Sequence, residues 1–597
     1  MSDRFGRKDI AGVEIDCERC ALRYGVGGCS AALSADTPNK CYNTRETCQD
    51  LDSYEREVFT LRYVQNVNGL PKTEHGYPVL NSLGGNPVKI SLGGTDGRMG
   101  TMGRRARMSV SITDFKDNDN AFDYYADERR SGAANFHGDA WEPEEKATHF
   151  RKLQARWPYY YGRALRVLYM QAGDDYADAE KEHYIITKRQ GPSGGAVTYE
   201  VQSPLILADK DKAQCPAASN GILFEDIDNE ATTLTLVAAG VGDDEYPASG
   251  KVSIGSEIAA FTRSGDELTL TERGTDGTEA SSHNAGDTVQ LCYVVTDGKI
   301  QDVLNDLLKN YAELPEPWLD DYTDDAWSGE CDRWLSGLCL NRVIPKPEAV
   351  IDLVGQLLEL GIAVWEDVPS QRIKLRVNRP NDIGEAAVWV TDSDDMLENS
   401  IAVTNLDEKR LSQVWAIHAS IRANGSAKDI NNFKIIDAPV ALNKETEDEY
   451  NQSKVLEVFL PWLGLSGDSS YAQTIAQRLL DRYENTPKAI VFDAPIVDRF
   501  SYGIGALIQL ETRHICDIHG EPLVTDMQVV EQELKRSTGR VRVTAETYKF
   551  TRQYGFITEN SRGEYGASTD AQKDQGTYFI DENTLKFPDG RGPYRFF

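Results

Sequence analysis

The chain has 597 residues, of which 64 are Lys or Arg and 95 are Asp or Glu, so its formal net charge at pH 7 is −31. This length predicts roughly three to five domains, and the acidic balance argues against a surface that grips nucleic acid by neutralising phosphates. An acidic wall would instead repel phosphate and let DNA slide past without sticking to it.

Neither a membrane span nor a secretory signal is predicted. No run of about 18 apolar residues occurs, and the N-terminal residues Met1–Asp9 lack an apolar stretch. We therefore expect the protein to be made in a cytoplasm, where thiols stay reduced and disulfides are disfavoured.

Residues 1–55 form a cysteine-rich segment that holds five of the ten cysteines of the chain, namely Cys17, Cys20, Cys29, Cys41 and Cys48. The segment has few apolar runs, so it needs a cross-link to keep a fixed shape. Three cross-links are open: a tetrathiolate zinc, an iron–sulfur cluster, or two disulfides. Zinc sites usually use two close Cys pairs, and only Cys17 and Cys20 make one. Iron–sulfur clusters accept longer and unequal spacings, whereas two disulfides leave one thiol over.

Residues 56–218 alternate short runs typical of strands with Gly and Pro turns, which predicts a first β-barrel domain. Residues 114–165 are acidic, aromatic and loop-like, and we expect the aromatic run Trp157–Gly162 to pack in a core or an interface. The predicted strands are 58–64, 87–92, 108–112, 165–170, 183–187 and 196–201.

Residues 219–297 differ in character from the sequence on either side. Short strand-like runs are separated by turns of Gly, Asp and Ser, which predicts a compact all-β module inserted into the chain. His283 is expected to be a turn residue of this module and not a metal ligand. The predicted strands are 231–237, 250–254, 257–262 and 267–271.

Residues 298–400 are predicted to form an α+β domain. Apolar residues recur at helical spacing over residues 300–311 and 350–358, and a hairpin is predicted over residues 362–377. We expect Cys331 and Cys339, which lie between the two helices, to be buried free thiols.

The last third of the chain returns to strand-like sequence. Residues 401–550 hold strand-like runs and one helical run over residues 471–483, which predicts a further, mostly β domain. Residues 551–597 are polar, Gly-rich and aromatic. Such a C-terminal arm is expected to become ordered against a partner.

The sequence gives no indication of catalysis. It contains no zinc-protease motif, no nucleophile elbow and no dinucleotide fingerprint. The other metal-like cluster is His514, Cys516, Asp517 and His519, but alternation along a strand would split these ligands between two faces. We therefore expect a protein that is not an enzyme.

Several blocks of the sequence resemble tail hub proteins of long non-contractile-tailed phages and the similar hubs of gene transfer agents. The resemblance covers most of residues 15–220, and residues 219–297 resemble a small β domain that is inserted in many phage structural proteins. The hub-like blocks are Cys29–Ala32, Lys40–Asp50, Gly103–Asp114, Ala155–Arg163 and Ser203–Pro216.

The resemblance implies a fold and a cofactor. The implied fold is α+β and mostly β, with two β-barrel hub domains, the α+β domain, the inserted module and the cysteine-rich segment. Some hubs of this group hold an iron–sulfur cluster, expected here as 4Fe–4S with zinc or no metal as alternatives. The matching ligands are Cys20, Cys29, Cys41 and Cys48, and Cys17 lies outside the family pattern.

The resemblance also implies an assembly. Hubs of this group are trimers that form a ring at the distal tail tip of the virion after synthesis in the host cytoplasm. The expected partners are the distal tail protein, the tape measure protein and the tail fibre or receptor-binding proteins, and DNA passes through the channel without specific binding. Two other functions stay open: an iron–sulfur redox protein, and a glycan-binding adhesin that uses the β module and the aromatic runs.

Overall fold

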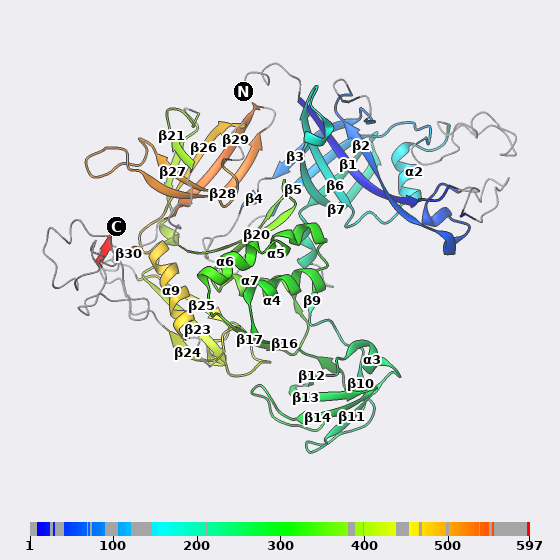
Figure 1. Cartoon of the computed structure of the whole chain (residues 1–597), viewed down its shortest axis with the longest axis vertical. Coiled ribbons are helices and arrows are strands. Elements are labelled where there is room, and N and C mark those ends of the chain that lie inside the picture. The colour runs from blue at the N-terminus through cyan, green and yellow to red at the C-terminus, as the bar shows by residue number, and fades with distance from the viewer. Residues whose placement is uncertain are drawn as a thin grey trace, which may run out of the picture.

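The computed structural model describes most of the chain, and its elements are arranged as in Figure 1. Among the described residues, no helix is both long and apolar enough to cross a membrane. The expected C-terminal arm lies almost entirely outside the described residues. The described ranges are 9–23, 28–29, 41–67, 70–71, 74–86, 88–89, 105–120, 145–209, 213–379, 388–397, 399–437, 453–464, 469–496, 501–535, 538–548, 552–554 and 594–596.

The expected fold class, mostly β with several sheets, is confirmed. The first sheet has seven strands in the order β2-β1-β6-β7-β8-β5-β3. It curls into a nearly closed barrel, because Val64 N donates to Tyr77 O (2.8 Å) beside β2 and Thr113 N donates to Val79 O (2.8 Å) beside β5. The strands are β1 Asp9–Cys20, β2 Arg56–Val64, β3 Leu80–Asn86, β5 Arg107–Thr113, β6 Ala164–Gln171, β7 Glu180–Ser193 and β8 Ala196–Gln202.

Strand β1 corrects the expected boundary of the cysteine-rich segment. It pairs with β2 along Gly12–Cys20 and with β6 along Asp9–Ile15, so it is an interior strand of the barrel. Its side chains alternate: Val13, Ile15 and Cys17 enter the hydrophobic core, whereas the acidic residues between them point outward. The part of residues 1–55 that lacks a core of its own therefore begins after Cys20.

The outward acidic residues of β1 are paired with arginines on both neighbouring strands. The Glu14 carboxylate accepts from Arg62 (2.8 Å) on β2 and from Arg166 (3.0 Å) on β6. Arg166 also pairs with Asp16 at 2.6 Å. Hydrogen bonds from Tyr176, Arg62 and Arg166 outweigh the effect of burial and lower the pKa of Glu14. These pairs hold the register of β1 between its two neighbours.

The loop-like expectation for residues 114–165 misses a helix, α2 His149–Arg156. Three of its polar residues, His149, Lys152 and Arg156, are at least nine-tenths buried. Only Phe150 and Leu153 of this helix join the hydrophobic core, so it lacks the longer apolar spacing that predicts helices from sequence.

The central region contains helices and a hairpin at the predicted places. Helix α4 Ile300–Asp306 continues into a π-helical turn at Leu307–Tyr311, α7 is Val350–Leu358, and β19 Ile362–Asp367 pairs with β20 Arg372–Val377. A further helix, α6 Ala326–Trp334, holds the buried thiol of Cys331, whereas Cys339 is half-buried.

The strands after residue 400 do not all join one barrel. Strand β23 Gln413–Ser420 pairs with β24 Phe433–Asp437 and with β25 Val455–Leu460 in a separate three-stranded sheet. Helix α9 Ser469–Tyr483 packs on this sheet, and both contribute to the same hydrophobic core as the first barrel and the central helices. The cause is that one face of β23 and β25 is apolar and is covered by α9.

The second large sheet has the order β21-β27-β28-β29-β26-β22 and its own hydrophobic core. A two-residue strand from the first half of the chain, β4 Val88–Lys89, pairs with β28, so the two halves are joined through this sheet. Figure 1 shows this sheet beside the first barrel, with the central helices below both. Its strands are β21 Val388–Thr391, β22 Ala402–Asn405, β26 Lys488–Pro495, β27 Leu507–Glu511, β28 Thr525–Lys535 and β29 Arg540–Thr547.

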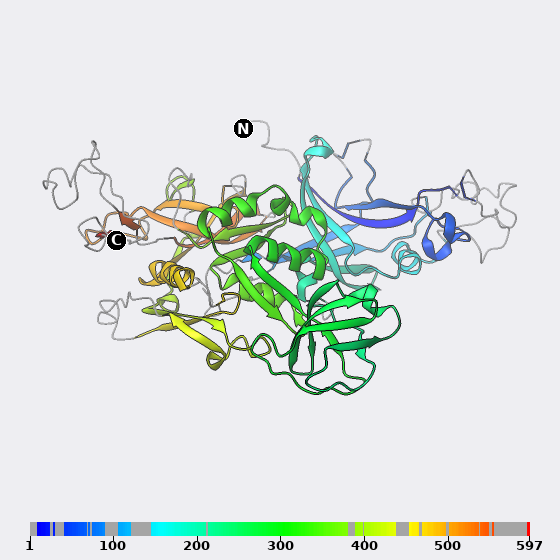
Figure 2. The ribbon, with the colours of Figure 1, turned by 60° about the horizontal axis from the view of Figure 1, so that its bottom comes forward.

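The inserted module is a six-stranded sheet with a third, separate core. Figure 2 shows it projecting from the rest of the chain. Its two ends meet, because Leu291 N donates to Ser219 Oγ (3.0 Å) and Gln290 Nε2 donates to Ala217 O (2.9 Å). The strands are β10 Ile222–Leu223, β11 Thr233–Val237, β12 Ser249–Ile254, β13 Glu257–Ser264, β14 Glu267–Glu272 and β15 Val289–Leu291.

The expected end of the module, residue 297, lies too far along the chain. Strand β16 Tyr293–Gly298 pairs with β17 Leu340–Ile344 in the central region, so the module ends just before β16. The module also touches the loop between β23 and β24. Ala423 N donates to Asp276 O (3.1 Å), and Asn424 Nδ2 donates to Ser256 O (3.0 Å).

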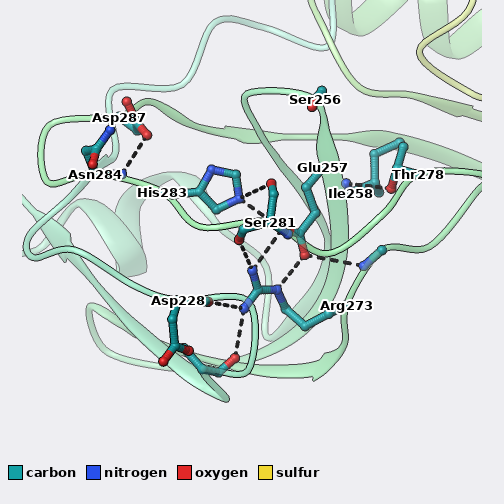
Figure 3. Close-up of polar contacts among 12 residues, drawn as sticks. Asp228, Ser256, Glu257, Ile258, Arg273, Thr278, Ser281, His283, Asn284 and Asp287 are labelled. Atoms are coloured by element: carbon teal, nitrogen blue, oxygen red, sulfur yellow. Dashed lines mark hydrogen bonds and ion pairs between the residues drawn. The ribbon is translucent and has the colours of Figure 1, made fainter.

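A buried carboxylate, that of Glu257, holds together residues 273–283 of the module (Figure 3). Glu257 is 1% exposed and accepts hydrogen bonds from Arg273 Nη2 (2.8 Å), Ser281 N (2.9 Å) and His283 Nε2 (2.9 Å). Arg273 also donates to Ala231 O (3.0 Å). Burial alone would raise the pKa of Glu257, but these hydrogen bonds hold it at about 2. His283 is therefore a structural turn residue, as expected.

Replacing Glu257 by Gln should destabilise the module by about 3 kcal/mol, because the Arg273 guanidinium loses the carboxylate that compensates its burial. Hydrogen exchange of β13 and β14 in the full chain should become faster, while exchange in β1 and β6 stays unchanged. Glu272→Gln, at an exposed position of the same module, is the matched control. In the wild type, the ionised Glu257 carboxylate stabilises the module above about pH 4.5, and this stabilisation is lost as the pH falls toward 2. Unchanged exchange in the Glu257 variant would contradict this role.

A candidate thiolate centre at the end of strand β1

The five N-terminal cysteines separate into one residue and a group of four. Cys17 lies in the middle of β1, is 3% exposed and belongs to the barrel core. Burial raises the pKa of its thiol to about 12, and the charged groups that act on it are Arg163, Asp16 and Glu18. Cys17 is therefore a core residue.

Cys20 ends β1 and lies beside the turn that carries Cys41. The Cys20 amide donates to Asn43 O (2.6 Å), and the Asn43 amide donates to Cys41 Sγ (3.3 Å). Asn43 has φ +58°, a left-handed conformation that Asn adopts more readily than most residues. This turn brings residues 41–43 against the end of β1.

A short 3-10 helix at Arg45–Thr47 carries the chain from Cys41 to Cys48. The Tyr42 amide donates to Thr47 Oγ1 (3.0 Å), and the Cys48 thiol donates to Asp50 O (3.0 Å). These local bonds hold Cys41 and Cys48 in one compact loop.

The other four cysteines, Cys20, Cys29, Cys41 and Cys48, affect one another electrostatically. The pKa of Cys41 is raised to about 11, mainly by burial and further by Cys48, Cys29 and Cys20. The pKa of Cys48 is raised by burial and by Cys20 and Cys29. Cys20 and Cys41 are buried, whereas Cys29 and Cys48 are half-buried. The group therefore has a buried side and a side that faces solvent.

The chemistry of this donor set fits a thiolate-bound metal. Four sulfur donors are what both structural zinc and iron–sulfur clusters use. Among the described residues, however, no three Cys, His, Asp or Glu side chains already stand in an arrangement that holds a metal ion. The bound metal is therefore a proposal. Residues 24–27 and 30–40, which link these cysteines, lie outside the described residues.

The other metal-like cluster, His514, Cys516, Asp517 and His519, lies between β27 and β28 and not on a strand. Cys516 is exposed and forms an isolated bridge with Pro522 in the turn between β27 and β28. Asp517 Oδ1 accepts from the amides of His519 (2.8 Å) and Glu521 (3.0 Å), so its role is to shape that turn.

No protein-family profile and no curated protein sequence matches this chain. Among solved structures, the chain is similar to the 43 kDa tail protein of prophage MuSo2 from Shewanella oneidensis. The identity is 9%, the match covers 79% of this chain and 98% of that chain, and the TM-score is 0.32.

Two further solved structures are similar. For the prophage tail protein gp18 of Listeria monocytogenes EGD-e, the identity is 8%, the coverage is 65% of this chain and 86% of that chain, and the TM-score is 0.28. The E. coli c3393 protein is a type VI secretion component with structural similarity to the T4 tail proteins gp27 and gp5. The identity is 9%, the match covers 87% of this chain and 96% of that chain, and the TM-score is 0.29. At such TM-scores these similarities carry no argument about fold or function.

Alkylation of native protein stripped of metal should follow the burial of the thiols. At pH 8, iodoacetamide should modify Cys48 before Cys17, because the raised pKa of about 12 leaves the Cys17 thiol almost fully protonated. The exposed Cys516 is the control and should react at once. Peptide mass spectrometry reads the order, and reaction of Cys17 as fast as Cys48 would contradict its place in the core.

Proposed function

We propose that this chain is a structural tail hub protein of a siphophage, located at the distal tip of the tail. The observation that carries the proposal is that the hub-like sequence blocks, far apart in the chain, meet around one barrel. The Arg156 guanidinium lies over the Tyr42 ring, 4.2 Å from its centroid, and Ser203 N donates to Ala106 O (3.1 Å). A family signature that assembles into one structural unit is what a shared architecture requires.

The proposed assembly is a homotrimeric ring. Each subunit would contribute two large sheets, the first barrel and the β21–β29 sheet, which lie beside each other in Figure 1. The ring would nucleate tail assembly and connect the distal tail protein and the tape measure protein to the fibres or receptor-binding proteins. With a net charge of −31, the ring would let DNA leave through its channel without holding it.

The ring predicts three copies per tail tip. Native mass measurement of the purified protein or of isolated tips should give three times 66.4 kDa. Gold-labelled antibodies against the chain should mark the end of the tail opposite the capsid in electron micrographs. A monomer in intact tips, or labelling along the whole tube, would contradict the hub.

The proposed cofactor is a 4Fe–4S cluster bound by Cys20, Cys29, Cys41 and Cys48. When bound, the group would supply a cross-link and not a reaction, since cytoplasmic synthesis disfavours disulfides and the segment after β1 lacks a core of its own. Cys20 would join the centre to the barrel, and the other three residues would fix the loop. Zinc on the same thiolates is the alternative and would keep the same structural role.

Anaerobically purified protein should contain about four iron atoms per chain and be brown. Cys41→Ser should remove the colour and loosen residues 41–55, because one thiolate is lost. Cys17→Ser is the matched control, a neighbouring thiol in the barrel core, and should keep the colour. Zinc in place of iron would contradict the proposed cluster but support a metal cross-link on the same thiolates. A metal-free protein in which residues 41–55 are fully ordered would contradict both the cluster and the metal cross-link.

A further inference from the structure

Helix α2 lies beside the cysteine loop and buries charged groups that the fold has to compensate. His149, Lys152 and Arg156 are 0%, 8% and 7% exposed. They lie at helical spacing, i, i+3 and i+7, and therefore face one side of the helix. A buried charge is costly unless it is paired and hydrogen-bonded, so the partners of this face are part of the structure.

The partners come from the loop that precedes the helix. The Asp119 carboxylate, 1% exposed, accepts from Arg156 through two nitrogens (3.0 and 3.1 Å) and from Lys152 Nζ (3.0 Å). Lys152 Nζ also donates to Asp117 O (2.8 Å). The bidentate contact fixes the plane of the Arg156 guanidinium.

A second chain of contacts fixes the start of α2 inside the barrel. His149 Nδ1 lies 2.7 Å from Asp117 Oδ2, and His149 Nε2 lies 2.8 Å from the hydroxyl of Tyr63 on β2. Burial acts to raise the pKa of Asp117, but the hydrogen bond with His149 prevails and lowers it. The whole helix is thereby held against the barrel wall.

The far end of α2 reaches the cysteine segment at two points. The Arg156 guanidinium lies over the ring of Tyr42, 4.2 Å from its centroid, and Tyr42 follows Cys41 directly. Trp157, the next residue, donates to Glu18 O (2.6 Å) near the end of β1. One helix end therefore contacts the strand that carries Cys20 and the loop that carries Cys41.

We infer that Arg156 and Tyr42 are positioning residues for the thiolate centre, and that α2 is its support. Asp119 and Lys152 hold the guanidinium in place, the guanidinium stacks on Tyr42, and the stack sets the position of Cys41 relative to Cys20. The inference rests on the proposed centre. A planar cation on an aromatic face suits this task, because the contact is attractive and constrains the ring without a covalent link.

The test compares Tyr42→Leu, Tyr42→Phe and wild-type protein in the full chain. Tyr42→Leu removes the aromatic face and leaves the Arg156–Asp119 pair intact, so iron or zinc should leave to a chelator about tenfold faster. Tyr42→Phe keeps the face and should match the wild type. Metal release that is unchanged in Tyr42→Leu, or equally fast in Tyr42→Phe, would overturn the stacking role.

Alkylation separates this inference from the proposed metal. In metal-stripped protein, Tyr42→Leu should make Cys41 react faster with iodoacetamide, while Cys17 stays protected. Faster reaction of both Cys41 and Cys17 would mean that Tyr42 and Arg156 stabilise the barrel as a whole and do not position the thiolate centre. That result would overturn the inference. If the wild type never contains metal, the proposed cofactor fails, and the change at Cys41 still decides whether Tyr42 and Arg156 position that thiol.

Discussion

The pairing of β1 on both of its edges is the constraint on which the rest of this region depends. β1 is bonded to β6 along Asp9–Ile15 and to β2 along Gly12–Cys20, and successive side chains of such a strand point to opposite faces. Cys17 therefore enters the core, and Cys20, at the point where pairing ends, lies beside the cysteine loop. The division of five thiols into one and four follows from backbone hydrogen bonding, before any metal is considered.

The second constraint is the cost of burying charge. Helix α2 packs a polar face against the barrel, and it is stable there because Asp117 and Asp119 compensate that face. The same ion pairs leave the Arg156 guanidinium in contact with Tyr42. Barrel folding and the position of the cysteine loop are thereby coupled through a few polar contacts, as is common where irregular loops are held by a rigid scaffold.

The sequence predicted strands correctly where apolar and polar residues alternate over a short stretch. In the inserted module, Leu234, Leu236, Leu268 and Leu270 alternate with polar residues, and the strands are where this alternation places them. Helix α2 was missed because most of its buried residues are polar, and only Phe150 and Leu153 are apolar. Strand β1 was missed because its outward residues, Glu14 and Asp16, are charged and need Arg62 and Arg166, which are distant in sequence. The site residues came from the family pattern, and Tyr42 and Arg156 could be recognised only once the fold placed them in contact.

X-ray absorption of the full-length protein, purified without oxygen, tests the central claim most directly. The account predicts a metal whose first shell is sulfur alone, at about 2.3 Å for zinc, or a sulfur shell with iron neighbours beyond it for a cluster. This signal should be lost in Cys41→Ser and kept in Cys17→Ser. A shell that contains nitrogen or oxygen ligands, or a folded protein without metal, would contradict a centre made of Cys20, Cys29, Cys41 and Cys48.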